Sequence, residues 1–387
     1  MVIAGGGPAG SSLAIRLANA GREVVLVERE AFPRNKLCGE FISPECLRHF
    51  GDLGVLKPML GAGGDRIRRT VFYGMRGSSI EIDSGLFGGE ALSLSRYAMD
   101  KILIERARQA GVTVLESSVV NHVEIDDSGK VAGAAVRTGS SSLELETSIL
   151  VDATGRSRSI SKLAGRARGR GREQASRGGE RRQKFVGYKA HLHGADVPAG
   201  TCEIYSFRGG YSGLSNIEGG AANHCFLVDA GVVKQYAGDA DRIVASTVMK
   251  NPRAAASLRS ADRSSEWLAV SVDNFGVNQP VTPEGIFAVG DASAFIDPFT
   301  GSGMLMALES SEILASSLLA DADSVFSPAM RYRRLYREKF TRRLLICGLL
   351  RRTAFMPWSA ETMIRLLSWS RPLSSAIARA TRPSRNP

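Results

Sequence analysis

The chain has 387 residues, which exceeds what one ordinary hydrophobic core accommodates and favours at least two domains. Hydrophobic residues make up 43% and charged residues 23%, a balance that is ordinary for a soluble globular enzyme and argues against wholesale disorder. The net charge of +11 is uneven, because segments 166–184 and 331–387 carry +6 and +12 and leave −7 on the remainder. Such basic segments favour anionic surfaces or ligands. Neither segment has a base-stacking aromatic pattern, so a nucleic-acid partner is not expected.

Cysteine usage and apolar run lengths indicate the compartment. The five cysteines are scattered and odd in number, and they lack paired metal-ligand spacing: Cys38, Cys46, Cys202, Cys225 and Cys347. This pattern predicts neither a disulfide framework nor a metal site, and a cytoplasmic location is the default. Met1 opens directly into a strand, so no signal peptide is predicted. The apolar runs are too short for a membrane-spanning helix.

Residues 1–27 predict a strand–turn–helix–strand unit. Residues 1–5 are apolar, residues 8–20 place apolar side chains at helical spacing, and residues 24–27 are continuously apolar, as in a buried parallel strand. The turn reads Gly5-Gly6-Gly7-Pro8-Ala9-Gly10. Gly5 permits the tight turn, Gly7 lets the backbone approach a pyrophosphate, and Gly10 lets helix and strand pack closely. We therefore expect Gly5, Gly7, Pro8, Ala9 and Gly10 to bind a dinucleotide.

Glu28 ends the second strand of this unit. A carboxylate at that position can accept both hydroxyl groups of an adenosine ribose, and it would repel a 2′-phosphate. Glu28 is therefore a further predicted cofactor residue.

The middle of the chain alternates strands with one clear helix. We expect a loop over 31–44, short strands over 72–94, a helix over 97–110 capped by Ser95, and strands over 112–115, 118–125, 131–137 and 148–151. The last strand runs into Asp152-Ala153-Thr154-Gly155. The Arg/Gly-rich stretch 166–184 has no periodicity and predicts a surface loop. Alternating apolar runs over 185–275 predict an antiparallel sheet.

A second strand–loop–helix unit, over 285–319, favours FAD over NAD. The strand 285–289 ends in Gly290-Asp291, and a long helix follows over 300–319. Asp291 can hold the hydroxyl groups of a ribityl chain, while Gly301 and Gly303 would let backbone N–H groups face a flavin ring. A helix N-terminus there would stabilise the negative charge of reduced flavin. No second G-x-G-x-x-G unit exists, so a nicotinamide donor, NAD(P)H, would bind only transiently.

Together these segments resemble the flavoprotein group that contains geranylgeranyl reductases, flavin-dependent halogenases and, more distantly, para-hydroxybenzoate-hydroxylase-like monooxygenases. The resemblance covers residues 1–325. Arg34-x-Lys36-x-Cys38-Gly39 and the stretch from Pro298 to Gly303 look more like the reductase branch. The halogenase pattern Trp-x-Trp-x-Ile-Pro is missing, because Trp267, Trp358 and Trp369 are isolated.

The resemblance implies that the loop with Arg34, Lys36, Cys38 and Gly39 passes beside the flavin. Positive charge there would favour anionic reduced flavin, and Cys38 could line the substrate side; Lys36 and Cys38 are thus the candidates for a catalytic role. In an extended loop Arg34, Lys36 and Cys38 share one face. The alternative is a solvated basic turn with a small apolar cysteine. We also expect cofactor contacts from Arg96, the backbone of Val119 or its neighbour, Asp152, Gly155, Gly290, Asp291, Pro298, Gly301, Gly303 and Met304.

Two sets of side chains in 185–275 have both a structural and a functional interpretation. His191 and His193 alternate on one predicted strand, so they point to the same face and can line a substrate cavity or act as an acid. A plain surface position is the favoured interpretation, and no metal is predicted. Tyr205, Phe207 and Tyr211 can shape an apolar pocket, although core packing is favoured.

We therefore expect an α/β protein with a Rossmann-like FAD-binding domain, an inserted antiparallel β-sheet substrate domain and a basic, helical C-terminal tail. The expected ranges are 1–70, 95–160 and 276–325 for the FAD domain, 71–94 and 185–275 for the substrate domain, 161–184 for a basic loop and 326–387 for the tail. The expected reaction is FAD-dependent reduction of a carbon–carbon double bond in an apolar, isoprenoid or polyketide-like small molecule. The alternatives are an FAD-dependent monooxygenase of an aromatic or polyketide substrate and a flavin-bearing redox or binding protein.

The tail predicts amphipathic helices, because arginines alternate with apolar residues three and four apart between residues 331 and 380. In the favoured interpretation the apolar face packs on the body. In the other, part of that face lies in a membrane interface with arginines against anionic headgroups, which would hold the enzyme peripherally at the inner face of the membrane.

Overall fold

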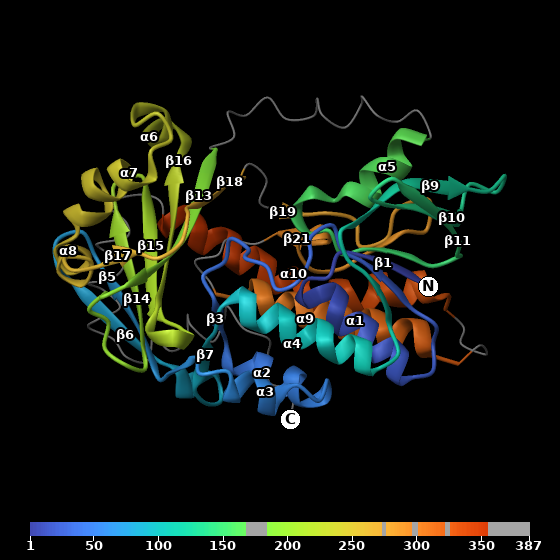
Figure 1. Cartoon of the computed structure of the whole chain (residues 1–387), viewed down its shortest axis with the longest axis horizontal. Helices are drawn as coiled ribbons and strands as arrows, with labels where there is room; N and C mark the ends of the chain where they lie inside the picture. Colours follow the sequence, from blue (N-terminus) through green and yellow to red (C-terminus); the bar gives the residue numbers. More distant parts are fainter. Residues whose placement is uncertain (168–183, 273–275, 296–300, 322–325, 355–387) are drawn as a thin grey trace.

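A parallel and an antiparallel sheet form the two ends of the molecule in Figure 1. The computed structural model describes residues 1–167, 184–272, 276–295, 301–321 and 326–354. The parallel sheet and its helices lie on the right of the view and the larger antiparallel sheet on the left. Pro298 and residues 168–183 and 355–387, for which we predict a flavin contact, a basic loop and the end of the tail, lie outside the described residues.

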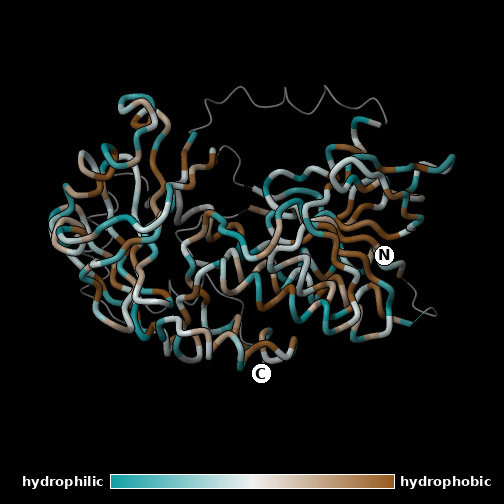
Figure 2. The backbone as a smooth tube through the Cα atoms, in the orientation of Figure 1, coloured by the Kyte–Doolittle hydropathy of each residue, from teal (hydrophilic) through white to brown (hydrophobic). Residues whose placement is uncertain are grey.

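The parallel sheet has the strand order β20-β12-β1-β2-β8. Its side chains alternate between two cores, because successive residues of a strand point to opposite faces. Ile3, Leu26 and Val151 face the helices, whereas Val2 and Leu150 face the second layer. These short strands are among the brown, apolar segments of Figure 2. The strands are β1 (Val2–Ala4), β2 (Val25–Val27), β8 (Thr113–Leu115), β12 (Leu150–Asp152) and β20 (Phe287–Ala288).

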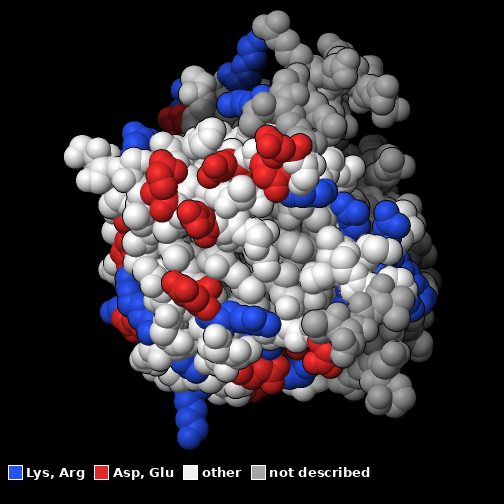
Figure 3. Space-filling model, turned by 90° about the vertical axis from the view of Figure 1, so that its right-hand side faces the viewer, with Lys and Arg blue, Asp and Glu red and all other residues white. Residues whose placement is uncertain are grey.

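Three helices cover one face of the parallel sheet, and a small antiparallel sheet with one helix covers the other. The helices on the first face are α1 (Pro8–Asn19), α4 (Arg96–Gln109) and α9 (Gly303–Leu319). The second layer is β9 (Ser118–Ile125), β10 (Val131–Thr138), β11 (Ser141–Glu146) and α5 (Ser159–Ala167). Figure 3 views this end of the molecule and shows acidic and basic side chains interspersed, as expected for a body of modest net charge.

The large sheet is antiparallel except for the parallel pair of β14 and β5, and its order is β17-β13-β16-β15-β14-β5-β6, with β18 also paired to β13. Its outward face is apolar and packs on short helices, with Tyr188, Tyr205 and Phe226 at the centre. Its strands are β5 (Arg69–Tyr73), β6 (Ser79–Asp83), β13 (Phe185–His193), β14 (Thr201–Phe207), β15 (Gly210–Asn216), β16 (Ala222–Asp229), β17 (Asp262–Arg263) and β18 (Leu268–Val272). The helices, at the far left of Figure 1, are α6 (Ala230–Gln235), α7 (Ala240–Ser246) and α8 (Pro252–Ser257).

Short elements connect the two ends. The first group is β3 (Phe41–Ile42), β4 (Asp65–Ile67) and β7 (Ala91–Ser93), which pair as β3-β7-β4, with α2 (Pro44–Asp52) and α3 (Leu56–Gly61) beside them. The second is the pair β19 (Gly276–Val277) and β21 (Ala294–Phe295). Ile67 and Ala91 pack against Cys202 of the large sheet, which joins the first group to its inner face.

Most predicted elements exist close to their predicted bounds. The exceptions have local causes. Residues 161–167, predicted as loop, continue α5, because Ser161 N and Oγ bind Asp152 Oδ2 at 2.9 and 2.7 Å and fix the first turn. The described part of segment 185–275 contains α-helices besides strands. The helix predicted over 300–319 spans Gly303–Leu319.

The described part of the basic tail is one helix, α10 (Pro328–Ala354), which crosses the middle of Figure 1. One stripe of it is buried at helical spacing: Tyr332, Tyr336, Phe340, Arg343 and Cys347. Tyr332 Oη donates to the carbonyl oxygen of Ala288 at 2.7 Å, and Arg343 Nη1 binds Glu309 Oε2 of α9 at 2.7 Å. Leu345, by contrast, is 70% exposed. From its start to Cys347, the helix therefore packs on the body by a single stripe of side chains.

Among the described residues, no helix combines the length and the apolar character needed to cross a bilayer.

The buried stripe predicts that α10 is an integral part of the fold. Phe340→Ala should lower the free energy of unfolding by about 3–5 kcal/mol, because it removes a fully buried aromatic ring and leaves a cavity. Leu345→Ala, on the exposed side of the same helix, should change it by less than about 0.5 kcal/mol. Urea unfolding followed by circular dichroism measures both. Equal effects of the two variants would contradict the packing of α10.

Candidate functional site

Of the three glycines of the G-x-G-x-x-G pattern, Gly5 and Gly10 are required by contacts within the protein, and Gly7 is not. A Cβ on Gly5, whose φ is 112°, would lie 2.3 Å from the Ala153 carbonyl oxygen, and a Cβ on Gly10 would lie 1.9 Å from the Gly5 oxygen. At Gly7 the nearest atom to such a Cβ is Arg96 Nη2, at 3.7 Å, and the φ of −76° suits any residue. Gly7 precedes the N-terminus of α1, where unpaired N–H groups attract phosphate. The space at Gly7 thus fits a pyrophosphate.

The two predicted cofactor motifs meet in space. Gly290, with a φ of 60°, approaches α1 so closely that a Cβ on it would lie 2.9 Å from Ala9 Cβ. Ser311 Oγ of α9 donates to the Ala9 carbonyl oxygen at 2.7 Å, and Gly290 N donates to Ser310 Oγ at 2.9 Å. These contacts fix α1 against α9 and bring Asp291 beside the glycine turn.

A chain of buried charges links Glu28 to Arg96. Glu28 Oε2 accepts from Gly6 N at 2.8 Å and from Arg34 Nη2 at 3.2 Å. Arg34 Nη1 binds Asp100 Oδ2 at 2.8 Å, and Arg96 binds both oxygens of Asp100 at 2.8 and 2.7 Å. Asp100 is completely buried, so two guanidinium groups neutralise one inaccessible carboxylate and remain cationic beside the glycine turn.

The loop with Arg34, Lys36 and Cys38 is not part of a strand, and its three side chains do not share one partner. Arg34 turns inward to Glu28 and Asp100, whereas Lys36 Nζ turns to Glu30 Oε1 at 2.5 Å. The thiol of Cys38 lies within hydrogen-bonding reach of Arg96. Each of the three side chains is thus positioned by a different partner.

The neighbouring residue Glu40 is a site residue that the sequence did not reveal. Glu40 is completely buried with a φ of 53°, and it binds Lys189 Nζ at 2.5 Å and His191 Nε2 at 2.8 Å. Burial raises the pKa of Glu40, but the hydrogen bond from His191 and the charge of Lys189 outweigh it and hold that pKa below its ordinary value. His191 is therefore not the plain surface residue that we favoured, whereas His193 is exposed.

Asp291 is a half-buried carboxylate with no hydrogen-bond or ion-pair partner among the described residues. Burial raises its pKa to about 6, although the charges of Arg156 and Arg96 lower it. A carboxylate in this state gains from hydroxyl donors, which a ribityl chain would supply. Asp291 thus fits the role predicted for it.

The other predicted cofactor residues lie around this centre. Ser118 N donates to the Glu28 carbonyl oxygen at 2.9 Å, which puts the 39% exposed Val119 next to Glu28. Gly301, Gly303 and Met304 lie at the start of α9, where a Cβ on Gly303 would meet nothing within 4 Å. Gly155, with a φ of 68°, begins a turn after β12.

Asp152 is placed differently from a cofactor ligand. Its Oδ1 accepts from Thr154 N and Oγ1 at 3.1 and 2.5 Å, and its Oδ2 accepts from both donors of Ser161. Its side chain therefore holds the turn and the start of α5, and a cofactor contact by Asp152 stays a prediction.

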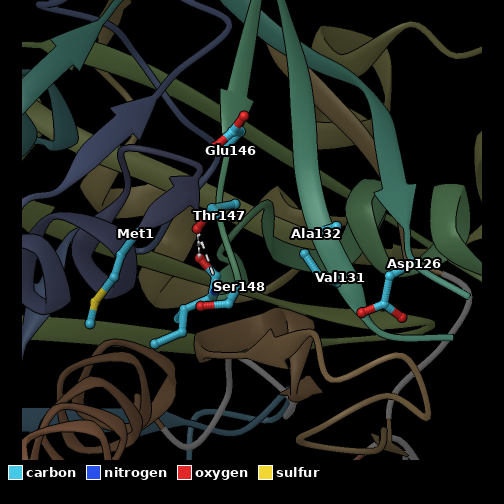
Figure 4. A pocket seen from close by; sticks show the side chains of 8 residues that line it. Met1, Asp126, Val131, Ala132, Glu146, Thr147 and Ser148 are labelled. Carbon is cyan, nitrogen blue, oxygen red and sulfur yellow. Dashed lines mark hydrogen bonds between the residues drawn. The ribbon is translucent and has the colours of Figure 1, made fainter. Parts of the chain in front are cut away.

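A shallow pocket of about 560 Å³ lies elsewhere, between Met1, the strand β10 and the turn after β11. Figure 4 shows Asp126, Val131 and Thr147 around it. None of the predicted cofactor residues lines it, so it is separate from the site described above.

Comparison with known proteins decides the family. A family model described as FAD binding domain matches residues 1–323. The chain belongs to this family. FAD is accordingly its cofactor, and the protein is an FAD-dependent enzyme of an oxidoreductase family. The mixed α/β architecture with a Rossmann-like FAD-binding domain is also confirmed.

Individual relatives span several chemistries. Digeranylgeranylglycerophospholipid reductase 2 of Methanopyrus kandleri is 26% identical over 353 residues, which is 88% of this chain and 82% of that protein. Tryptophan 2-halogenase of Chondromyces crocatus is 25% identical over 89% of this chain and 66% of that protein. A geranylgeranyl bacteriochlorophyll reductase-like protein of Thermoplasma acidophilum has the same fold, with a TM-score of 0.79, 23% identity and coverage of 95% and 91%.

Because the glycines have different environments, we expect one substitution to cost FAD binding and another to cost folding. Gly7→Val should abolish FAD binding while leaving the free energy of unfolding of the apoprotein unchanged, because only the cofactor needs that space. Gly10→Val should prevent folding, since its side chain would overlap the Gly5 carbonyl. Gly61→Ala, where a Cβ meets nothing within 4 Å, is the matched control. Flavin absorbance and thermal unfolding measure the outcomes, and retention of FAD by Gly7→Val would refute the placement of the pyrophosphate.

The raised pKa of Asp291 predicts a pH-dependent affinity for FAD. Hydroxyl donors favour the carboxylate, so binding lowers the pKa of Asp291 and affinity rises as pH increases through about 6. The dissociation constant should be about tenfold larger at pH 5 than at pH 7.5, where Asp291 is ionised before binding. Asp291→Asn should bind more weakly at pH 7.5 and lose this dependence. Fluorescence titration of the apoprotein measures both, and an equally steep dependence in the variant would exclude Asp291 as its source.

Proposed function

We propose that this enzyme reduces a carbon–carbon double bond of an apolar, isoprenoid or polyketide-like small molecule. The observation that carries the proposal is an apolar cluster between the large sheet and the segment that follows Asp291. Phe185, Tyr211, Leu227 and Val272 pack together on the inward face of the sheet, and Ile204 and Phe295 pack against them. Phe295 lies four residues after Asp291 and under the guanidinium of Arg156, at 5.0 Å.

Each group of side chains has a share in this reaction. When bound, reduced FAD supplies a hydride to one carbon of the substrate double bond. The glycine turn, Glu28, Arg96 and Asp291 bind and orient the cofactor, and the N-terminus of α9 favours its negative reduced form. The apolar cluster excludes water and holds the substrate chain. Tyr211 belongs to this cluster, whereas Tyr205 and Phe207 belong to the core on the outward face, as expected for packing residues.

Two proposals concern partners. The electron donor is a nicotinamide nucleotide, NAD(P)H, that binds transiently; the sequence holds one dinucleotide-binding turn, and FAD takes it. The exposed apolar residues Phe326, Met330 and Leu345 lie on or beside the arginine-rich α10, which supports a peripheral contact with an anionic membrane where a lipophilic substrate dissolves.

The reductase proposal has a direct test against oxygen-dependent chemistry. Purified enzyme, reduced by dithionite under strict anaerobiosis, should reoxidise when mixed with digeranylgeranylglycerophospholipid in detergent micelles. Mass spectrometry should find products that have gained pairs of hydrogen atoms. A reaction that needs air and adds oxygen or, with bromide present, halogen would refute the proposal in favour of a monooxygenase or halogenase.

The apolar cluster can be tested in the same assay. Leu227→Ala should lower kcat/KM by about tenfold, because a buried leucine contributes about 1.5–3 kcal/mol of apolar contact. Its FAD content should not change. Leu143→Ala, on the exposed strand β11, is the matched control and should behave as the wild type. Equal kcat/KM for Leu227→Ala and the wild type would show that the cluster does not bind the substrate.

A further inference from the structure

The loop 37–40 docks residue by residue on the inward face of the large sheet. A Cβ on Gly187 of β13 would lie 3.2 Å from Leu37 Cδ2, and Asn223 Nδ2 of β16 donates to the Cys38 carbonyl oxygen at 3.2 Å. A Cβ on Gly39 would lie 3.7 Å from Cys225 Sγ. The loop that reaches the cofactor site is therefore fixed to the sheet that carries the apolar cluster.

Glu40 is the last residue of this docked segment, and its carboxylate binds two basic side chains of one strand. Lys189 and His191 lie two residues apart on β13, so both point to the inward face and reach the two oxygens of Glu40. Lys189 and Glu40 are 2% and 0% exposed, and their opposite charges cancel. His191 is 16% exposed and so has access to solvent. His191 is therefore the member whose protonation changes the net charge of the cluster.

The hydrogen bond also decides which atom of His191 exchanges a proton. Glu40 Oε2 is a carboxylate oxygen and accepts, so His191 Nε2 carries a hydrogen in both charge states. The proton that comes and goes is the one on Nδ1.

The cluster is one residue away from the cofactor site. Arg96 N donates to Glu40 Oε1 at 2.8 Å, while the guanidinium of the same residue lies 3.7 Å from the Cβ position of Gly7. The charge of Arg96 also acts on Asp291. Arg96 therefore links Glu40, and through it His191, to the cofactor site, so a change of charge at that site acts electrostatically on the cluster.

Few other titratable groups face the cluster among the described residues. The thiols of Cys38 and Cys225 lie beside Glu40 and Lys189, and burial, with the charges of Cys38 and Glu40, raises the pKa of Cys225 to about 12. Cys225 therefore stays neutral. Ser265 Oγ accepts from His191 N at 2.9 Å and carries no charge. Glu218 lies on the other side of Arg96, where it binds Ser95 N at 3.0 Å.

We propose that His191, held by Glu40 and Lys189, takes up a proton at Nδ1 when the bound flavin becomes negative on reduction, and passes this proton to the substrate. The second step rests on the proposed function. One carbon of the double bond receives the hydride, the adjacent carbon receives the proton from Nδ1, and the carbon–carbon π bond is lost. Neutral His191 remains bonded to Glu40 and regains its proton from solvent. The electrons come from a two-electron donor of the nicotinamide class, or from dithionite in the test.

The first experiment needs no substrate. The reduction potential of bound FAD is titrated with dithionite and mediator dyes between about pH 6 and pH 8, where a histidine titrates. Its slope against pH gives the number of protons taken up with two electrons. His191→Asn removes the titrating nitrogen, so it should take up fewer protons than the wild type, by up to about one. His193→Asn, two residues along the same face and exposed, is the matched control and should match the wild type.

The outcomes are decisive in either direction. Equal slopes for the wild type and His191→Asn, or an equal loss in His193→Asn, would overturn the proposal, because the extra proton would then reside on the flavin or elsewhere. His191→Gln, whose longer amide takes the position of Nε2 and donates to Glu40, should show the same loss, and it replaces His191→Asn if that variant fails to hold FAD.

A second arm separates this proposal from the proposed function. Single-turnover reoxidation by digeranylgeranylglycerophospholipid should lose its pH dependence in His191→Asn while FAD content stays unchanged. Failure of this lipid to reoxidise the wild-type flavin, with the slope difference intact, would overturn the reductase function and leave proton uptake by His191 standing. Reoxidation with the same pH profile in both proteins would overturn proton transfer by His191.

Discussion

The buried carboxylate of Asp100 is the constraint on which the cofactor end of the molecule depends. A charge removed from water is tolerated only when opposite charges and hydrogen bonds replace the lost hydration. Arg34 and Arg96 supply both the opposite charge and the hydrogen bonds, and each also binds a second carboxylate. Arg34 extends the constraint to Glu28 and the glycine turn, and the backbone of Arg96 extends it to Glu40 and the large sheet. Removal of either arginine would leave a poorly compensated buried charge, at a cost of about 3–5 kcal/mol. One helix, one loop and one turn are thereby held in fixed relation before any cofactor binds.

The sequence predicted the parts of this structure that depend on local pattern. The glycine turn, the acidic residue after the second strand and the Gly-Asp pair at position 290 each combine a residue type with a strand or helix boundary, and these signals lie within short windows. The strands of the parallel sheet and of β9 and β10 were placed within about two residues, because buried strands are continuously apolar or strictly alternating.

The parts that the sequence did not predict depend on contacts between distant residues. Glu40 and His191 are separated by 151 positions, and no local rule connects a glutamate in a loop with a lysine and a histidine on a strand. The positive φ of Glu40 has no signal either, because glutamate is not a residue that favours this region. The partners of Arg34, Lys36 and Cys38 were not predicted for a related reason. The prediction used the alternation of an extended loop, whereas separate acidic or cationic partners decide where these side chains point.

The large sheet has a consequence for how the protein is made. Its strands β5 and β6 come from residues 69–83, and β5 pairs in parallel with β14, so that Arg69 lies opposite Thr201. During synthesis the hairpin of β5 and β6 therefore emerges long before its partner strand β14. Until β14 is made, the edge of β5 is unpaired, and such an edge is prone to aggregate or to bind chaperones. The slow step of folding should be the closure of this long connection. Any contiguous fragment that contains the complete large sheet also contains β8 to β12 of the other end, so this sheet cannot be exchanged or expressed without those strands.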